Sequence, residues 1–322
     1  MKHLLSIETM ATADMAAILK LAKKMKVSRG HHAEHPATLA RCGEEGKPLQ
    51  HQCWAMMFSK SSTRTRVSFE VGIRELGGDP IFLNAQDIQL GRGEPIADTA
   101  RVIGRMCHGA VIRTFAQKDV EDFAKYSGIP TINALTDDEH PCQILTDIFT
   151  FEEKHKSIRG KIVCFIGDGN CNVPRSWLFA AARLGFHLRI ASPEKYLPPQ
   201  AILDRARAIA EKEKSGGTIA TTSVLAAAAK GVDLLYTDVW ISMGKESESA
   251  ERLKDLAEYQ INAELVALAK KNALVMHCLP AYRGKEITAD VFEAHASTIF
   301  DQAENRLHVQ KAILSLLDQR QG

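Results

Sequence analysis

The sequence lacks any long apolar run and any excess of charge of one sign. No window approaches about 20 uninterrupted apolar residues, the length that a membrane-spanning helix needs. The residues Met1 to Glu8 also lack the longer apolar region of a secretory signal, so we expect the protein to stay in the cytoplasm. Lys and Arg number 41 against 39 Asp and Glu, a formal net charge of +2. This balance does not indicate a nucleic-acid-binding stripe or a polybasic membrane patch.

Paired cysteine motifs and internal repeats are also missing. The seven cysteines are an odd number without a C-x-x-C pair, which favours reduced thiols over disulfides or structural zinc. We expect most of them to be small core residues, with Cys278 as a separate case. Neither a repeat nor a low-complexity tract interrupts the chain, so a globular fold is expected throughout.

The length and the order of apolar segments predict two α/β domains. A chain of 322 residues with 45% hydrophobic content is too long for one small core and favours two domains of about 150 residues each. Apolar runs alternate with helical patterns in both halves, which predicts two parallel sheets flanked by helices. The expected strands are Trp54–Phe58, Ile81–Leu83, Ala110–Ile112, Thr131–Ala134, Ile162–Ile166, His187–Ala191, Leu234–Tyr236 and Leu274–Met276. We place the domains at residues 1–148 and 149–322, joined by a helix within 144–156, with the active site in the crevice between them.

The segment Ser62–Arg66 is the most informative motif. It follows the apolar run Trp54–Phe58, and Ser62 and Thr63 stand where the N-cap of the next helix belongs. Free backbone N–H groups, the helix dipole, hydroxyls and an Arg would then converge on one anion, which a phosphate fits best. A capped helix with two solvated arginines is the plainer interpretation. It is disfavoured because Lys60 adds further positive charge that an anion would neutralise.

Two further segments of the first half stand at strand ends. Arg113 ends the run Ala110–Ile112, where its guanidinium could reach a ligand held by the first motif. Pro141 is suited to the first position of a helix, which leaves His140 and Gln143 at its mouth. Each residue alone would more often be solvated or structural. Beside an anion site, imidazole and amide groups can polarise a carbonyl and orient an amide.

In the second half, Asp238 and Cys278 each follow an expected strand. The loop Asp238–Gly244 offers a carboxylate for an ammonium group and a turn for a carboxylate, which suits the zwitterion of an amino acid. An ordinary capped loop is the alternative. Cys278 follows His277, but a thiol nucleophile is disfavoured because neighbouring residues of an extended chain point to opposite sides.

Two more segments allow more than one interpretation. Residues 302–308 are expected to open the last helix, from which Arg306 could reach the same crevice or remain on the helix surface. The turn Gly167–Asn170 suggests dinucleotide binding, but it lacks the third glycine and has no acid about 20 residues later. A polar turn that contributes Asn170 or Asn172 to the crevice is favoured.

Together these motifs resemble the aspartate/ornithine carbamoyltransferase family along the whole chain, in its ornithine branch. The resemblance implies transfer of the carbamoyl group of carbamoyl phosphate to the δ-amine of L-ornithine, without a metal or organic cofactor. It implies carbamoyl phosphate contacts from Ser62, Thr63, Arg64, Thr65, Gln89, Arg113, His140, Gln143 and Arg306. It implies ornithine contacts from Asn172, Asp238, Ser242, Met243, Cys278 and Leu279, with Arg64, Arg113, His140 and Cys278 as the catalytic set.

The resemblance also bears on assembly and on alternatives. Gln89 is similar to a glutamine that the family supplies from a neighbouring subunit, which implies a homotrimer or a multiple of trimers. The turn Gly167–Val173 is one residue longer than in the family, so Asn170 remains an alternative to Asn172. An N-acylated ornithine or another amine is the alternative acceptor, and a silent ligand-binding regulator of the same fold is the alternative to an enzyme. NAD-dependent dehydrogenation is a third reading.

Overall fold

The computed structural model describes residues 1–29, 46–84, 93–242 and 244–318. These residues divide into two compact units, Met1–Phe149 with Glu304–Gly322, and Thr150–Ala303. Two helices therefore contribute to both units, α5 (Pro141–His155) and α12 (Ala296–Asp318). Within the described residues, every helix is too short or too polar to cross a lipid bilayer.

Among the residues described in the first unit, four parallel strands lie in the order β2-β1-β3-β4. They are β1 (Cys53–Phe58), β2 (Asp79–Asn84), β3 (Gly109–Arg113) and β4 (Thr131–Leu135). All of β3 and β4 and nearly all of β1 are buried, as expected for a parallel sheet with helices on both faces. The four apolar runs predicted in this half are thus confirmed as strands.

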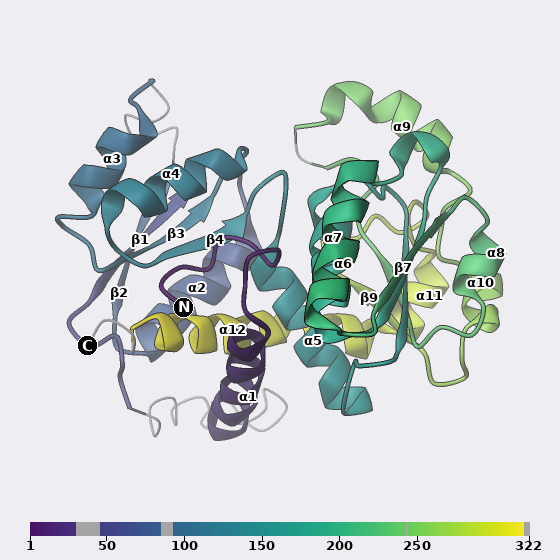
Figure 1. Ribbon diagram of the computed structural model, residues 1–322, viewed down its shortest axis with the longest axis horizontal. Coiled ribbons are helices and arrows are strands. Elements are labelled where there is room, and N and C mark those ends of the chain that lie inside the picture. Colours follow the sequence, from purple (N-terminus) through teal and green to yellow (C-terminus); the bar gives the residue numbers. More distant parts are fainter. Residues whose placement is uncertain (30–45, 85–92, 243, 319–322) are drawn as a thin grey trace. The chain divides into compact units, whose positions relative to one another are not determined.

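The helices of the first unit lie on both faces of this sheet (Figure 1). Helices α3 (Ile96–Ile103) and α4 (Gln117–Ser127) pack on β1 and β3 through one apolar cluster. Its buried members are Ala55, Met57, Ala100, Ala110, Ile112, Val120 and Phe123. Helix α2 (Thr63–Glu75) and the end of α12 lie on the opposite face.

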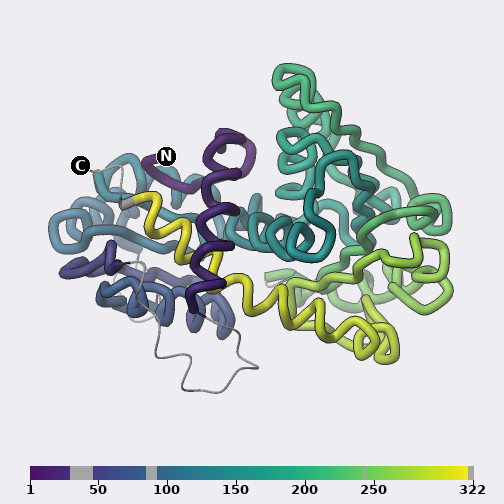
Figure 2. The backbone as a smooth tube through the Cα atoms, turned by 90° about the horizontal axis from the view of Figure 1, so that it is seen from below, coloured from purple at the N-terminus to yellow at the C-terminus, as the bar shows by residue number. Residues whose placement is uncertain are grey.

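The first and last helices of the chain are tied together in this unit. Figure 2 shows α1 (Thr12–Arg29, purple) crossing the C-terminal part of α12 (yellow). Lys26 of α1 donates to Asn305 of α12 over 2.7 Å. Glu75 at the end of α2 accepts from Arg29 of α1 at 2.9 Å and from Lys311 of α12 at 2.7 Å. These contacts hold α12 against the unit that contains the Ser62–Arg66 motif.

The described part of the second unit forms five parallel strands in the order β7-β6-β5-β8-β9. They are β5 (Ile162–Ile166), β6 (His187–Ala191), β7 (Thr218–Thr222), β8 (Leu234–Thr237) and β9 (Leu274–His277). Four of them were predicted from the sequence. The Thr-rich β7 was missed because it is an edge strand with one neighbour, so its side chains are only partly buried and form no apolar run.

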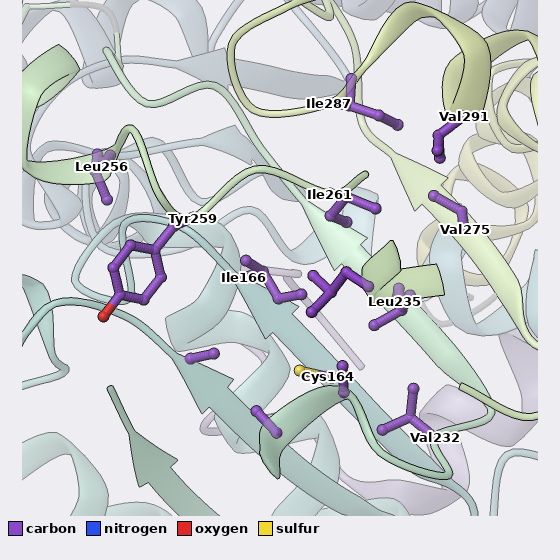
Figure 3. Packing of buried hydrophobic residues seen from close by; sticks show 14 of the residues in the cluster. Cys164, Ile166, Val232, Leu235, Leu256, Tyr259, Ile261, Val275, Ile287 and Val291 are labelled. Carbon is purple, nitrogen blue, oxygen red and sulfur yellow. The ribbon is translucent and has the colours of Figure 1, made fainter. Parts of the chain in front are cut away.

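Helices α6 and α7 cover one face of the second sheet, and α8 and α10 cover the other (Figure 1). The helices of this unit are α6 (Asn172–Leu184), α7 (Gln200–Glu213), α8 (Leu225–Ala229), α9 (Ser249–Leu256), α10 (Ala263–Leu268) and α11 (Ala289–Ala294), with 3₁₀ turns at Glu194–Tyr196 and Glu246–Glu248. Figure 3 shows Ile166, Leu235 and Val275 from three neighbouring strands packed with residues of the loops and helices above them. This buried cluster gives the second unit its own core.

The beginning of the last helix was predicted wrongly. Helix α12 begins at Ala296, so residues 302–308 lie inside it and do not open it. Thr298 and Ile299 have modest helix propensity, but Ile299 is buried in the core of the second unit. Tertiary packing therefore extends the helix beyond the start that local sequence suggested.

Both sheets have a point where the strand order reverses. The chain runs from β1 outward to β2 and then returns to β3 on the other side of β1. In the second unit the same reversal lies between β5 and β8. Ligands of open parallel sheets bind outside the carboxyl ends of the strands at such points. Phe58 is paired with Arg113 at the first point, and Ile166 with Thr237 at the second.

Candidate active site

The first half-site begins at the N-terminus of α2. Ser62 is the N-cap, with an extended backbone, and its hydroxyl accepts from the Thr65 N–H at 3.3 Å, which confirms the predicted cap. The remaining free N–H groups of the first turn and the helix dipole attract an anion. The half-buried Arg64 makes no side-chain hydrogen bond or ion pair with any described residue, so its charge is available to a ligand.

Arg66, the second arginine of the motif, is engaged by neighbouring side chains. Arg66 donates to Glu70 at 2.8 Å on the next turn, and its guanidinium lies 3.7 Å from the centre of the Phe82 ring. Lys60 is also engaged, because it pairs with Asp137 and lies 4.3 Å from the Phe115 ring centre. Part of the positive charge that was expected to need an anion is therefore neutralised by Asp137 and Glu70.

Arg113 and Arg306 supply further buried positive charge. Arg113 ends β3 as predicted and is 5% exposed, and its carbonyl accepts from the Ser59 N–H at 2.8 Å. Arg306 is 3% exposed and donates to the Thr65 hydroxyl at 2.6 Å. This bond joins α12 to α2 across 241 positions of sequence. Arg306 is thus a member of the first half-site and not a helix-surface residue.

His140 is buried beside these arginines. It precedes α5, whose first residue is Pro141 as predicted. Burial lowers the pKa of His140 well below its ordinary value, and the charges of Arg306 and Arg113 lower it further. The imidazole is therefore neutral near pH 7. A neutral imidazole can donate a hydrogen bond to a carbonyl oxygen without adding a competing charge.

This lowered pKa predicts a pH-dependent stability. The unfolded chain takes up a proton at His140 near its ordinary pKa of 6.5, whereas the folded chain does not, so stability falls as the pH falls below that value. Between pH 6.5 and 5, His140→Asn should lose less stability than the wild type, by at most about 1.4 kcal/mol per pH unit. Urea unfolding across this range measures the difference.

His51→Asn provides the control for that measurement. His51 is exposed and has a left-handed backbone, which asparagine tolerates. This variant should keep the pH dependence of the wild type. Equal pH dependence for His140→Asn and the wild type would contradict the neutral, buried state of His140.

The start of α5 places a second polar group near His140. Gln143 is 1% exposed, and its Nε2 donates to Asp147 Oδ1 at 2.8 Å. The preceding turn is fixed by Glu139, whose carboxylate accepts from the Ser6 hydroxyl and from the Ile7 N–H. The imidazole and the amide are thus held by a rigid connection between β4 and α5.

The second half-site is built on buried Asp238 and half-buried Cys278. Thr237 and His277 are paired at the ends of β8 and β9, so the residues that follow them leave the sheet side by side. Cys278 Sγ donates to Asp238 Oδ1 at 3.0 Å, and the Val239 N–H donates to the same oxygen at 2.7 Å. The Asp238 carboxylate and the Cys278 thiol are therefore in direct contact.

The electrostatics of Asp238 favour a cationic ligand. Burial raises the pKa of Asp238, while His277, the Cys278 thiol and the Val239 N–H act in the opposite direction. A carboxylate that has lost water without gaining a full ion pair is stabilised by a bound ammonium group. The pair is therefore suited to an amine.

His277 serves the loop and is not a base for the thiol. Its Nε2 is 3.1 Å from Glu286 Oε1, and its Nδ1 accepts from the Leu279 N–H at 2.9 Å. Asp238, His277 and Cys278 offer ligand atoms within 4.8 Å of one another, as a metal site would. Both ring nitrogens of His277 are already used, however, so the imidazole has no lone pair for a metal or for the Cys278 proton.

The glycines of the turn after β5 have structural roles that do not require a bound dinucleotide. Gly167 has a φ of +130°, and a Cβ on Gly169 would lie 2.8 Å from Ile190. Asp168 is 5% exposed and accepts from Arg252 at 2.6 Å, and Arg252 also donates to the Trp240 carbonyl at 3.3 Å. The glycines thus meet backbone and packing needs, and Arg252 ties this turn to the loop that follows β8.

The two asparagines of the same turn differ. The side chain of Asn170 accepts from Arg175 at 2.9 Å and the residue is exposed. Asn172 is the first residue of α6 and is half-buried. Asn172 is thus the less exposed of the two and stands at the N-terminus of α6.

Other predicted ligand contacts are Ser242, Met243, Leu279 and Gln89. Ser242 is half-buried after β8, and the Gly244 N–H donates to the carboxylate of Glu246 at 3.0 Å. Leu279 is half-buried with a φ of +59°. Gln89 and Met243 lie outside the described residues.

Comparison with known proteins adds the family. The model of the aspartate/ornithine carbamoyltransferase carbamoyl-P binding domain matches residues 2–153, and that of the Asp/Orn binding domain matches residues 159–317. The chain belongs to the aspartate/ornithine carbamoyltransferase family. The resemblance drawn from the sequence motifs is thus confirmed, as is the α/β fold with two parallel sheets.

Relatives in this family are similar along their whole length. Ornithine carbamoyltransferase of Akkermansia muciniphila is 53% identical over 325 residues, 100% of both chains. That of Campylobacter fetus is 45% identical over 320 residues, 99% of both chains. The solved structure of ornithine carbamoyltransferase from Pyrococcus furiosus has a TM-score of 0.89 at 43% identity and covers 98% of this chain and 96% of that chain.

Sequence reasoning missed two residues that support the half-sites. Asp147 lies four positions after Gln143 on the same helix, a spacing at which side chains meet, and this signal could have found it. Arg252 has no comparable signal, because 84 positions separate it from Asp168. Only the packing of α9 brings the two together.

Proposed function

We propose that this chain transfers the carbamoyl group of carbamoyl phosphate to the δ-amine of L-ornithine, giving L-citrulline and phosphate. Full-length relatives named ornithine carbamoyltransferase support this function. The structural observation that carries it is the contact between buried Asp238 and half-buried Cys278 at the carboxyl ends of β8 and β9. Aspartate would need cations here for its extra carboxylate, whereas a buried carboxylate repels one.

In this proposal the first half-site binds the phosphate, which is the leaving group. Ser62, Thr63, Arg64 and Thr65 bind the phosphate at the N-terminus of α2. Arg113, Arg306 and neutral His140 stabilise negative charge on the carbonyl oxygen and on the departing phosphate. Gln143 engages the amino group of the carbamoyl moiety.

The second half-site prepares the nucleophile. A side-chain amine has a pKa near 10.4, so its neutral form lies roughly 4 to 5 kcal/mol uphill at pH 7. Asp238 anchors the ammonium end of ornithine and Cys278 assists removal of the δ-proton, with Asn172, Ser242, Met243 and Leu279 as further contacts. The N–C bond then forms through a tetrahedral intermediate, the C–O bond to phosphate breaks, and one proton leaves the nitrogen.

Domain roles, assembly and location belong to the same proposal. We assign carbamoyl phosphate binding to residues 1–148 and ornithine binding to residues 149–322, with the last helix completing the first site through Arg306. A homotrimer, with Gln89 supplied by a neighbouring subunit, is the proposed assembly. The free thiols among the described cysteines fit a cytoplasmic protein.

A panel of amines tests the function. Purified protein is mixed with carbamoyl phosphate and with ornithine, acetylornithine, putrescine or aspartate in turn, and release of phosphate and formation of the carbamoylated amine are measured. Ornithine should react at least about a hundredfold faster than the others, because each of them leaves a buried polar group unmatched. Faster reaction with any other amine would overturn the proposed acceptor, and no reaction with any of them would favour a silent binding protein.

A further inference from the structure

Asp147 is a buried acid that the mechanism above does not use. It lies on the second turn of α5, is fully buried, and accepts from Gln143 Nε2 at 2.8 Å. Gln143 is buried as well, and its Oε1 has no hydrogen-bond partner among the described residues. The two ends of one amide are thus in different situations, one held by a carboxylate and the other open.

A carboxylate and an amide impose a direction on each other. The carboxylate oxygens of Asp147 accept hydrogen bonds, so the amide of Gln143 must turn its NH₂ group toward them. Its carbonyl oxygen then faces the other way. If the amide were reversed, two acceptor oxygens would face each other in a buried place, which is strongly unfavourable.

The chemistry of the first half-site makes this direction important. Arg64, Arg113 and Arg306 offer only hydrogen-bond donors, and these suit a phosphate and a carbonyl oxygen. The amino group of a carbamoyl phosphate is itself a donor and needs an acceptor. The Oε1 atom of Gln143 is such an acceptor, and Gln143 lies three residues after His140 at the start of α5.

We propose that Asp147 is a positioning residue that orients the Gln143 amide and thereby selects carbamoyl phosphate over acyl phosphates without an amino group. This inference rests on the proposed function, because it assigns the ligand amino group to Gln143. In this proposal Asp147 does not touch the ligand and acts on it through Gln143. Its effect is therefore confined to ligands that carry the NH₂ group.

Two stable phosphonates separate this effect from phosphate binding. Phosphonoacetamide keeps the NH₂ group of carbamoyl phosphate, and 2-oxopropylphosphonate carries a methyl group in its place. Calorimetry on the full-length protein gives their dissociation constants for the wild type, Asp147→Asn, Gln143→Leu and the double variant. An asparagine at position 147 can present its own NH₂ to Gln143 and so allows the amide to reverse.

The expected result is a selective loss. The wild type should bind the amide about tenfold more tightly than the ketone, the effect of one buried hydrogen bond. Asp147→Asn should lose most of this preference while its affinity for the ketone stays within about twofold. In the Gln143→Leu background, Asp147→Asn should change neither affinity, because a residue that acts through Gln143 has no effect in its absence.

Other results would overturn the proposal. Equal weakening of both phosphonates, or an effect of Asp147→Asn that persists with Leu at position 143, would indicate a general structural role. Absence of any preference in the wild type would remove the acceptor role of Gln143. A wild type that binds neither phosphonate would instead contradict the proposed function itself.

Two further variants serve as a control and as a replacement. Asp98→Asn makes the same change at an acid of the same unit that is 58% exposed and paired with Arg101, and it should bind both phosphonates as the wild type does. If Asp147→Asn does not fold, Asp147→Ser takes its place, because a hydroxyl can also donate to Gln143 and release the orientation. The same selective loss is expected.

Discussion

Arg64→Ala should lower kcat about 10³-fold, the usual effect of removing one preorganised donor from a site where negative charge develops. The guanidinium of Arg64 stands at the N-terminus of α2 without a side-chain partner among the described residues. It is therefore free to hold the phosphate and to stabilise the charge that builds up as the C–O bond breaks. Steady-state kinetics with saturating ornithine measure the loss.

The same variant should remain folded. Because the Arg64 side chain has no ion pair with any residue that the structure describes, the free energy of unfolding of the variant should stay within about 0.5 kcal/mol of the wild type. Arg66→Ala is the matched control, two positions along the same helix, because that arginine is paired with Glu70 and lies over Phe82. Arg66→Ala should keep nearly full activity. Near-normal turnover in Arg64→Ala would reject the role of Arg64.

Asp238→Asn should reduce kcat/KM for ornithine about 10³-fold, since removal of one partner from a buried charge pair costs about 3 to 5 kcal/mol. Asparagine keeps an oxygen for the Cys278 thiol and the Val239 N–H, so the loop after β8 should keep its shape. The substitution removes only the negative charge that attracts the ammonium group. The dissociation constant of carbamoyl phosphate should not change.

Asp238→Asn should lower activity without lowering stability. Burial raises the pKa of Asp238, so the ionised carboxylate destabilises the folded state relative to the unfolded one at neutral pH. Asp238→Asn should therefore be as stable as the wild type or more stable in urea unfolding at pH 7. Such an opposition is expected where a charge is kept for function.

Asp204→Asn gives the control in the second unit. Asp204 is 61% exposed and is paired with Arg207 on the surface of α7, so kinetics and stability should both stay near those of the wild type. An unchanged kcat/KM for ornithine in Asp238→Asn would mean that another group anchors the amine. The structural argument for ornithine over aspartate would then fail with it.

Local features of the site could be predicted from the sequence. The N-cap at Ser62, the first helical position at Pro141 and the strand end at Arg113 are confirmed. Each depends on the conformational preferences of a few neighbouring residues, which the sequence contains directly. The alternation of apolar runs likewise determined both parallel sheets, because a buried parallel strand needs apolar residues on both of its faces.

The sequence also contained more positive charge than the site uses. Lys60 and Arg66 belong to the same motif as Arg64, and only the structure shows that Asp137 and Glu70 hold them. Charge density along a sequence says nothing of which side of a helix or loop a side chain takes. A contact of that kind is decided by neighbours that the fold supplies.

Tertiary structure alone decided the remaining members of the site. Arg306 meets Thr65 because α12 packs against the first sheet, and Arg252 meets Asp168 because α9 covers the end of β5. Cys278 meets Asp238 because β8 and β9 are paired in register. The sequence by itself determined which chemical groups this protein has and which local structures carry them. Strand order and helix packing decided which of those groups meet, because contacts between distant residues depend on the burial of whole elements and not on local preference.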